Sequence, residues 1–253
     1  MLICSHGLTR NRHDFDFIAD YLSQSYRVIC FDLPGRGDSD WLENKMNYDY
    51  PQYVIDALMV ISRTGGNKVD WLGTSMGGIL GMLLASMDNS PINRLILNDV
   101  GPFIPKQALK DIAQYVGKLP SCNTAKELES YMRTIYAGFG ELTDLNWQQM
   151  FKYGHKTLEN GLFTLSYDPG ISEPFLSKPL DDIDLWPIWQ KIKQPCLLIR
   201  GAESGLLTPE TANKMTHRGP SPELYTVNKT GHAPALMNIE QCQFIANWLE
   251  NNE

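Results

Sequence analysis

Residues 68–86 constrain the fold of this chain more than any other stretch. A short apolar run from Val69 to Leu72 stops at Gly73, and two residues later apolar residues recur at helical spacing. The segment Gly73-Thr74-Ser75-Met76-Gly77 therefore fits the pattern G-x-S-x-G between a strand and a helix, which is the context the pattern requires. Because glycines leave room at a sharp turn, we expect the Ser75 hydroxyl to project above the sheet, at the positive end of the helix dipole.

Short apolar runs alternate with helical patterns over much of the chain. This order predicts an α/β fold, in which a mostly parallel sheet is wrapped by helices. The predicted strands are 2–5, 27–31, 69–72, 93–98, 195–200 and 224–227, and the predicted helices between them are 14–24, 53–63, the helix after Ser75, 209–217 and 239–249.

The alternation breaks between residues 103 and 189. Helical patterns occupy 105–116, 124–139 and 145–158, and no convincing buried strand is found among them. We interpret 103–189 as a helical lid, or cap, inserted into a core formed by residues 1–102 and 190–253. A helical module of this size buries little core of its own, so we expect it to cover the upper edge of the sheet.

Composition excludes several classes of function. The 253 residues suit one α/β domain with an insertion, and the formal net charge of −7 without a basic run argues against a nucleic-acid partner. No apolar run approaches a membrane span and no signal-peptide pattern opens the chain, so no membrane association is expected. Five cysteines without paired spacing favour reduced thiols and a cytoplasmic location. No cluster has metal-ligand spacing, and we expect neither a metal nor an organic cofactor.

Three segments with candidate catalytic residues follow predicted strands. They are His6-Gly7-Leu8 after the first strand, Ser75 at its turn, and Gly231-His232 after the last strand. In open α/β sheets, sites lie outside the carboxyl ends of the strands. The three segments therefore point to one site at one edge of the sheet.

These segments together resemble the α/β-hydrolase superfamily over nearly the whole chain. The loop Asp32-Leu33-Pro34-Gly35-Arg36-Gly37-Asp38-Ser39 and the ending Gly231-His232-Ala233-Pro234 are similar to its lid-bearing branch. That branch includes carboxylesterases, C–C hydrolases of meta-cleavage products, cofactor-free haloperoxidases and haloalkane dehalogenases. The dehalogenases carry aspartate as the nucleophile, so Ser75 argues against that chemistry.

The resemblance implies a role for each matching residue. Ser75 would be the nucleophile and His232 the base that removes its proton. The backbone amides of Leu8 and Met76 would form the oxyanion hole. For His6 we expect a structural role in shaping the oxyanion loop.

The acid of the expected triad departs from the family pattern. Relatives usually place an aspartate in the loop after the strand at 195–200, but here that loop is Gly201-Ala202-Glu203-Ser204-Gly205, with Ser204 and Gly205 where the aspartate is expected. Asp99, at the end of the preceding core strand, is the favoured candidate. Glu203 is the second candidate, and the absence of any working acid is the third possibility.

The sequence thus predicts a serine hydrolase that cleaves small to medium carboxylic esters through an acyl-enzyme on Ser75. One alternative is a C–C bond hydrolase of the meta-cleavage-product type. Another is a catalytically weak, ligand-binding member of the fold, because the usual loop aspartate is missing.

The first strands of the usual family sheet are absent from this sequence. Without them, Val28 to Phe31 would form an exposed apolar edge, which natural proteins avoid. We therefore expect either residues upstream of Met1 or a partner over this edge, such as the second copy of a homodimer.

Overall fold

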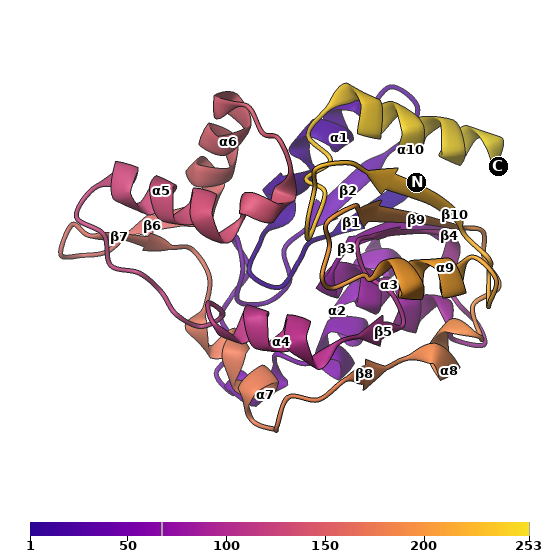
Figure 1. The fold of residues 1–253 in the computed structure, drawn as a ribbon, viewed down its shortest axis with the longest axis horizontal. Helices are drawn as coiled ribbons and strands as arrows, with labels where there is room; N and C mark the ends of the chain where they lie inside the picture. Colours follow the sequence, from indigo (N-terminus) through magenta and orange to yellow (C-terminus); the bar gives the residue numbers. More distant parts are fainter. Residues whose placement is uncertain (67, 253) are drawn as a thin grey trace.

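The computed structural model describes residues 1–66 and 68–252, and its centre is a six-stranded sheet (Figure 1). The strand order is β10-β9-β4-β3-β1-β2, and every neighbouring pair is parallel. This sheet confirms the predicted α/β class. The strands are β1 (Leu2–Ser5), β2 (Val28–Phe31), β3 (Val69–Thr74), β4 (Ile92–Asn98), β9 (Cys196–Gly201) and β10 (Glu223–Val227).

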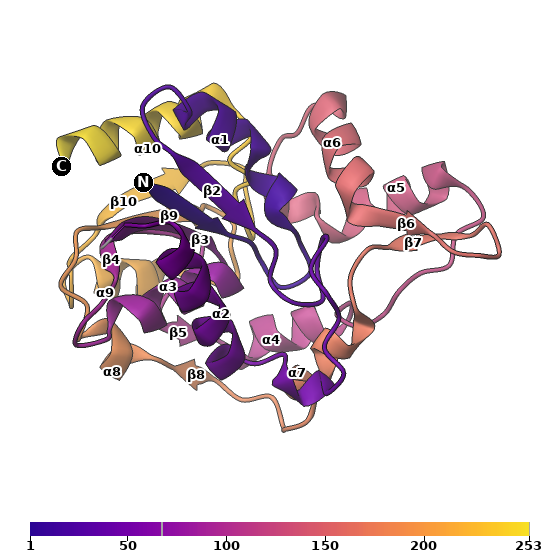
Figure 2. The same ribbon diagram turned by 180° about the vertical axis from the view of Figure 1, so that it is seen from behind.

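Helices cover both faces of the sheet (Figures 1 and 2). One face carries α1 (Asp16–Leu22), which follows the 3-10 turn η1 (Arg12–Phe15), and α10 (Ile239–Asn251). The other face carries α2 (Tyr50–Arg63), α3 (Met76–Ala85) and α9 (Pro209–Met215). Strand side chains alternate between two apolar clusters, which explains why these strands are continuous apolar runs in the sequence.

The capping residues explain where the helices begin. Helix α2 begins at Tyr50, three residues before the predicted start, because the Asp49 side chain accepts a hydrogen bond from the Gln52 amide and Pro51 lies in the first turn. Thr208 caps α9, and its side chain accepts a hydrogen bond from the Thr211 amide at 3.1 Å. A short turn, η2 (Lys45–Asn47), precedes α2.

Residues 103–189 contain more short strands than the sequence predicted. The expected helices are present, but two small antiparallel sheets accompany them, so the expectation of helices alone was wrong. Strands of two or three residues are too short to leave a recognisable apolar run. The elements are β5 (Phe103–Ile104), α4 (Lys106–Ala113), α5 (Ala125–Ile135), η3 (Ala137–Phe139), α6 (Asp144–Gly154), β6 (His155–Thr157), β7 (Phe163–Leu165), η4 (Pro169–Ile171), α7 (Ser172–Leu176), β8 (Ile183–Asp184) and α8 (Trp186–Trp189).

The two ends of this segment lie side by side. Strand β5 pairs with β8, so that Phe103 is opposite Asp184, and the Leu185 amide donates to the Pro102 carbonyl at 2.6 Å. The segment therefore leaves and re-enters the rest of the chain at nearly the same place. Helices α5 and α6 extend away from the sheet, whereas α4 and α7 lie closer to α2 (Figures 1 and 2).

Strand β2 forms one edge of the sheet. Among the described residues no strand pairs with its outer side, and its four residues are half-buried. A shallow groove runs beside it, lined by Ile29 of β2 and by Met59, Val60 and Arg63 of α2. The homodimer expected to cover this edge remains a prediction.

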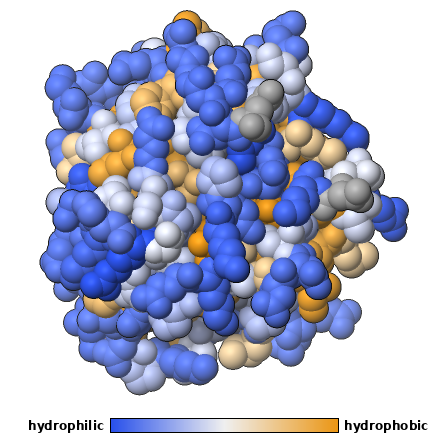
Figure 3. All heavy atoms as spheres, turned by 90° about the vertical axis from the view of Figure 1, so that its right-hand side faces the viewer, coloured by the Kyte–Doolittle hydropathy of each residue, from blue (hydrophilic) through white to orange (hydrophobic). Residues whose placement is uncertain are grey.

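The face at the right of Figure 1 is largely hydrophilic, with small apolar patches between the polar side chains (Figure 3). Across residues 1–66 and 68–252, no helix combines the length and the apolar character needed to cross a membrane.

Candidate active site

Ser75 stands at a strained turn between β3 and α3. Its φ and ψ are 53° and −115°, a conformation that non-glycine residues rarely adopt. The flanking glycines are required by close backbone contacts. A Cβ on Gly73 would lie 2.2 Å from the Gly77 carbonyl oxygen, and a Cβ on Gly77 would lie 2.1 Å from the Ser5 carbonyl oxygen. The turn therefore packs against β1 as well as against itself.

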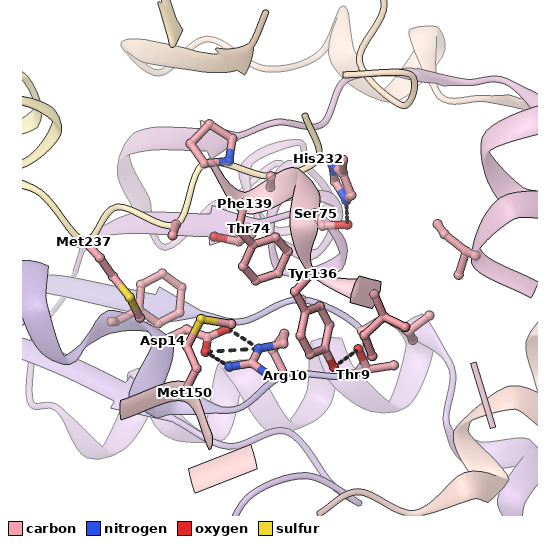
Figure 4. A pocket seen from close by; sticks show the side chains of 18 of the residues that line it. Thr9, Arg10, Asp14, Thr74, Ser75, Tyr136, Phe139, Met150, His232 and Met237 are labelled. Atoms are coloured by element: carbon pink, nitrogen blue, oxygen red, sulfur yellow. Dashed lines mark hydrogen bonds and ion pairs between the residues drawn. The ribbon is translucent and has the colours of Figure 1, made fainter. Parts of the chain in front are cut away.

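Ser75 begins a chain of hydrogen bonds that ends at Asp99. The Ser75 Oγ lies 2.8 Å from His232 Nε2, and His232 Nδ1 lies 2.7 Å from Asp99 Oδ2 (Figure 4 shows the first contact). A carboxylate can only accept, so Nδ1 carries the proton and Nε2 is free to accept the Ser75 hydroxyl proton. The structure thus brings together three of the predicted residues, from the ends of β3, β4 and β10.

Asp99 is completely buried and held by three donors. Besides His232, the Gly201 amide donates to Oδ1 at 2.8 Å and the Ser204 hydroxyl donates to Oδ2 at 2.6 Å. The Ser204 Oγ accepts from the amides of Leu206 and Leu207, at 3.2 and 3.1 Å, so its own proton points to the carboxylate. Each carboxylate oxygen is thereby satisfied without water.

Glu203 does not take the place of the acid. Its side chain is exposed, and within residues 1–66 and 68–252 its one hydrogen bond is from its backbone amide to the Thr230 carbonyl, at 2.8 Å. Ser204 occupies the position where the family pattern places an aspartate, and its hydroxyl contacts Asp99. No local pattern could have indicated this contact, because a serine in a loop is usually an ordinary turn residue.

Hydrogen bonds hold the loop that carries His232 on two sides. Asn98, the last residue of β4, donates to the Pro234 carbonyl at 2.8 Å and to the Thr74 hydroxyl at 3.0 Å. From the segment 103–189, Gly138 of η3 accepts a 2.8 Å hydrogen bond from the Gly231 amide. The imidazole is therefore positioned by β4 and by the predicted lid together.

The Leu8 and Met76 amides are available as donors beside Ser75. In the described parts of the chain, neither amide has a hydrogen-bond acceptor. Arg36, whose side chain is completely buried, contacts both residues: its Nε donates to the Leu8 carbonyl at 2.9 Å, and its Nη2 lies 3.8 Å from the Met76 sulfur. Its Nη1 donates to the Tyr53 hydroxyl at 2.7 Å.

Arg36 was not identified as a site residue from the sequence. An arginine in a Pro-Gly loop is typical of an exposed turn, and its burial depends on neutral partners that lie far apart in the sequence. We infer that it fixes the two residues that would bind the oxyanion.

His6 is a structural residue of the same loop. Its Nε2 accepts from the Leu33 amide at 3.0 Å, and its Nδ1 donates to the Gly7 carbonyl at 2.8 Å. Both ring nitrogens are thus occupied in the neutral form. Burial lowers the pKa of His6 to about 4. This geometry agrees with the structural role expected from the sequence.

Two cavities meet at Ser75. The first, here called the Arg10 cavity, has a volume of about 70 Å³ and is lined by Arg10, Asp14, Tyr136 and His232, among others (Figure 4). The second, here called the apolar cavity, has a volume of about 260 Å³, and its lining includes Met76, Val100, Ile104, Phe175 and Leu206. Ser75, Leu8 and Ile112 line both. Over residues 1–66 and 68–252, no group of three or more His, Cys, Asp or Glu side chains is placed to hold a metal ion.

A parallel sheet covered on both faces, with a serine on a strained strand-to-helix turn facing a histidine, defines the α/β hydrolases. The family model described as "alpha/beta hydrolase fold" matches residues 1–238. The chain belongs to this family.

Relatives within the family include hydrolases of known name. The chain is 40% identical over 249 residues to the "3-hydroxybutyrate-oligomer hydrolase" of Cupriavidus necator, covering 95% of this chain and 85% of that protein. Among solved structures, a protein from Rickettsia typhi described as a "Putative Hydrolase" superposes with a TM-score of 0.94 at 38% identity, covering 100% of this chain and 87% of the other. An α/β hydrolase from Novosphingobium aromaticivorans has a TM-score of 0.88 at 33% identity, with coverages of 98% and 88%.

Proposed function

We propose that this hydrolase cleaves small to medium carboxylic esters through an acyl-enzyme on Ser75. The observation that carries the proposal is the continuous hydrogen-bond chain from Ser75 through His232 to the buried Asp99, at the junction of two cavities. A serine hydroxyl is a weak nucleophile until a base removes its proton, and a histidine oriented by a carboxylate is such a base.

The reaction follows from the positions of these atoms. Ser75 Oγ attacks the ester carbonyl carbon while its proton moves to His232 Nε2. The imidazolium that forms is stabilised by Asp99, and it then protonates the leaving alkoxide as the ester C–O bond breaks. Water, deprotonated by the same imidazole, attacks the acyl-enzyme and releases the acid.

The carbonyl oxygen becomes an anion in the tetrahedral intermediate. The free amides of Leu8 and Met76 are the donors for it, and Arg36 holds the first through its carbonyl and contacts the side chain of the second. Donors that are oriented before the reaction stabilise the developing charge without reorganising, which is the largest single contribution in many enzymes.

The substrate class is suggested by the relative of 40% identity, which by its name hydrolyses oligomers of 3-hydroxybutyrate. Such oligomers are short aliphatic esters, and the apolar cavity of about 260 Å³ suits a branched aliphatic acyl chain. We propose oligoesters of short 3-hydroxy acids as the substrates.

The alternative of a catalytically weak ligand-binding protein loses its main support. It depended on the absence of an aspartate in the loop after β9, but Asp99 approaches His232 from the neighbouring strand at 2.7 Å. A C–C hydrolase would use the same serine and histidine, so only its substrate separates it from an esterase.

The test is steady-state hydrolysis of p-nitrophenyl butyrate and of the 3-hydroxybutyrate dimer. We expect turnover by the wild-type protein and its loss in Ser75→Ala. The matched control is Ser62→Ala, at an exposed serine of α2. Wild-type turnover no higher than that of Ser75→Ala would refute the proposal, and turnover of a meta-cleavage product alone would favour the C–C alternative.

A further inference from the structure

The two cavities at Ser75 differ in which reacting groups they contain. His232 lines the Arg10 cavity and is absent from the lining of the apolar cavity. Met76, one of the proposed oxyanion donors, lines only the apolar cavity. The site is therefore divided, with the proton donor on one side and an oxyanion donor on the other.

This division indicates which half of an ester substrate would occupy each cavity. The leaving oxygen must lie next to His232 Nε2, because that nitrogen supplies its proton. The leaving alcohol then extends into the Arg10 cavity, and the acyl group extends into the apolar cavity.

The Arg10 cavity contains a buried guanidinium. Arg10 is 5% exposed, and its Nε and Nη2 bind both carboxylate oxygens of Asp14 at 2.5 to 3.1 Å. The guanidinium carbon lies 4.6 Å from the centre of the Tyr136 ring. Figure 4 shows the two side chains next to each other in the cavity lining. Among the described lining residues, Arg10 is the only side chain besides His232 that can be cationic.

Arg10 stays charged in this position. Burial alone would lower its pKa, but the Asp14 carboxylate and the Tyr136 hydroxyl outweigh burial and hold the pKa above its ordinary value. Asp14 uses one edge of the guanidinium, and a planar guanidinium has further N–H groups with which it can bind a second carboxylate. The partial neutralisation by Asp14 keeps such binding weak enough for the product to leave.

We propose that Arg10 recognises a leaving group that carries a carboxylate, so that the enzyme releases one hydroxy acid at a time from the carboxyl end of an oligoester. The inference rests on the proposed ester hydrolysis. In the first step the Ser75 Oγ–acyl bond forms, the acyl C–O bond breaks, and the serine proton passes through His232 to the leaving oxygen. The free hydroxy acid departs with its carboxylate near Arg10, and water then releases the shortened oligomer from Ser75.

The experiment compares two substrates that differ only in charge. They are the 3-hydroxybutyrate dimer with a free carboxylate and the same dimer as its primary amide, and the readout is release of 3-hydroxybutyrate or 3-hydroxybutyramide. We expect the wild-type kcat/KM to favour the acid by about 10-fold or more, as one charge-assisted hydrogen bond would give. In Arg10→Gln this preference should fall to about 1, mainly through KM for the acid.

Two further variants keep the test decisive. Asp14→Asn removes the competing carboxylate and should increase the preference for the acid, whereas Arg133→Gln, at a half-exposed arginine of α5, should leave the preference as in wild type. If Arg10→Gln does not fold, the inference is tested by the preference of the wild type for the acid over the amide and by the change of that preference in Asp14→Asn.

Failure of this inference is distinguishable from failure of the proposed function. Equal kcat/KM for acid and amide in the wild type, or an unchanged preference in folded Arg10→Gln, would overturn the assignment of Arg10 while ester hydrolysis stands. Absence of turnover of both dimers and of p-nitrophenyl butyrate would refute the proposed function itself.

Discussion

The hydroxyl of Ser204 donates a 2.6 Å hydrogen bond to the Oδ2 oxygen of Asp99. Ser204 lies in the loop after β9, where relatives usually carry the triad aspartate. Asp99 lies at the end of the adjacent strand β4. Because the two strands are neighbours, a carboxylate from either can reach one imidazole. In the proposed triad the acid therefore comes from β4, and Ser204 of the loop after β9 contacts it.

Replacing Asp99 should remove the orientation of His232. For Asp99→Asn we expect kcat to fall by about 10⁴-fold with little change in KM, because the amide stabilises the wrong tautomer and cannot balance the imidazolium. The matched control is Glu203→Gln, which changes an exposed carboxylate of the neighbouring loop. Steady-state kinetics on p-nitrophenyl butyrate check this, and equal rates for Asp99→Asn and wild type would remove Asp99 from the triad.

Moving the carboxylate between the two strands gives a second prediction. Ser204→Asp should lower activity, since it removes a donor to Asp99 and places a second carboxylate beside it. In the double variant Asp99→Asn/Ser204→Asp, activity should recover above that of Asp99→Asn alone, because the new carboxylate lies within reach of His232 Nδ1. Higher activity in the single variant Ser204→Asp would mean that Asp99 does not serve as the acid.

Arg36 should affect catalysis through the oxyanion donors. In Arg36→Met we expect kcat to fall by about 10- to 100-fold, less than the loss of a donor itself would cause, with KM changed by no more than about threefold. Thermal unfolding of the same variant is the control, because the substitution leaves the Leu8 and Pro34 carbonyls without the donor that Arg36 supplies, at a cost of about 1–3 kcal/mol each. A loss of stability with kcat unchanged would leave Arg36 a purely structural residue.

Stability should fall in weak acid because His6 is buried in its neutral form. Its pKa is about 4 in the folded protein, below the ordinary value of 6.5, so between these values the unfolded chain binds a proton that the folded chain does not. The contribution of His6 to the free energy of unfolding is fully present above pH 6.5 and is lost as the pH falls toward 4. From pH 7.5 to 5, the free energy of unfolding should fall by about 2 kcal/mol more in wild type than in His6→Gln. Urea unfolding at both pH values measures this, and equal falls would contradict it.

The sequence was sufficient to predict the sheet and the edge at which Ser75 and His232 meet. The core strands are continuous apolar runs because both faces of the sheet are covered, and Ser75 and His232 follow strands whose carboxyl ends share one edge. The pattern around Ser75 was informative because the close contacts of Gly73 and Gly77 leave no room for a side chain.

The supporting residues could not be found in this way. Ser204 and Arg36 act through partners that are distant in the sequence, and each has an unremarkable local context. Strand β5 pairs with β8, and β6 pairs with β7. Such short pairings leave no apolar pattern in the sequence. Local patterns therefore locate Ser75 and His232, whereas the residues that contact and support them are identified only by tertiary contacts.

The most direct measurement is covalent labelling with a fluorophosphonate, followed by mass spectrometry of the intact protein and its peptides. Because the proposed mechanism activates one serine, we expect a single adduct, on Ser75, that forms much more slowly in His232→Ala. An adduct on another residue such as Ser204, or labelling of Ser75 at equal rates with and without His232, would contradict it.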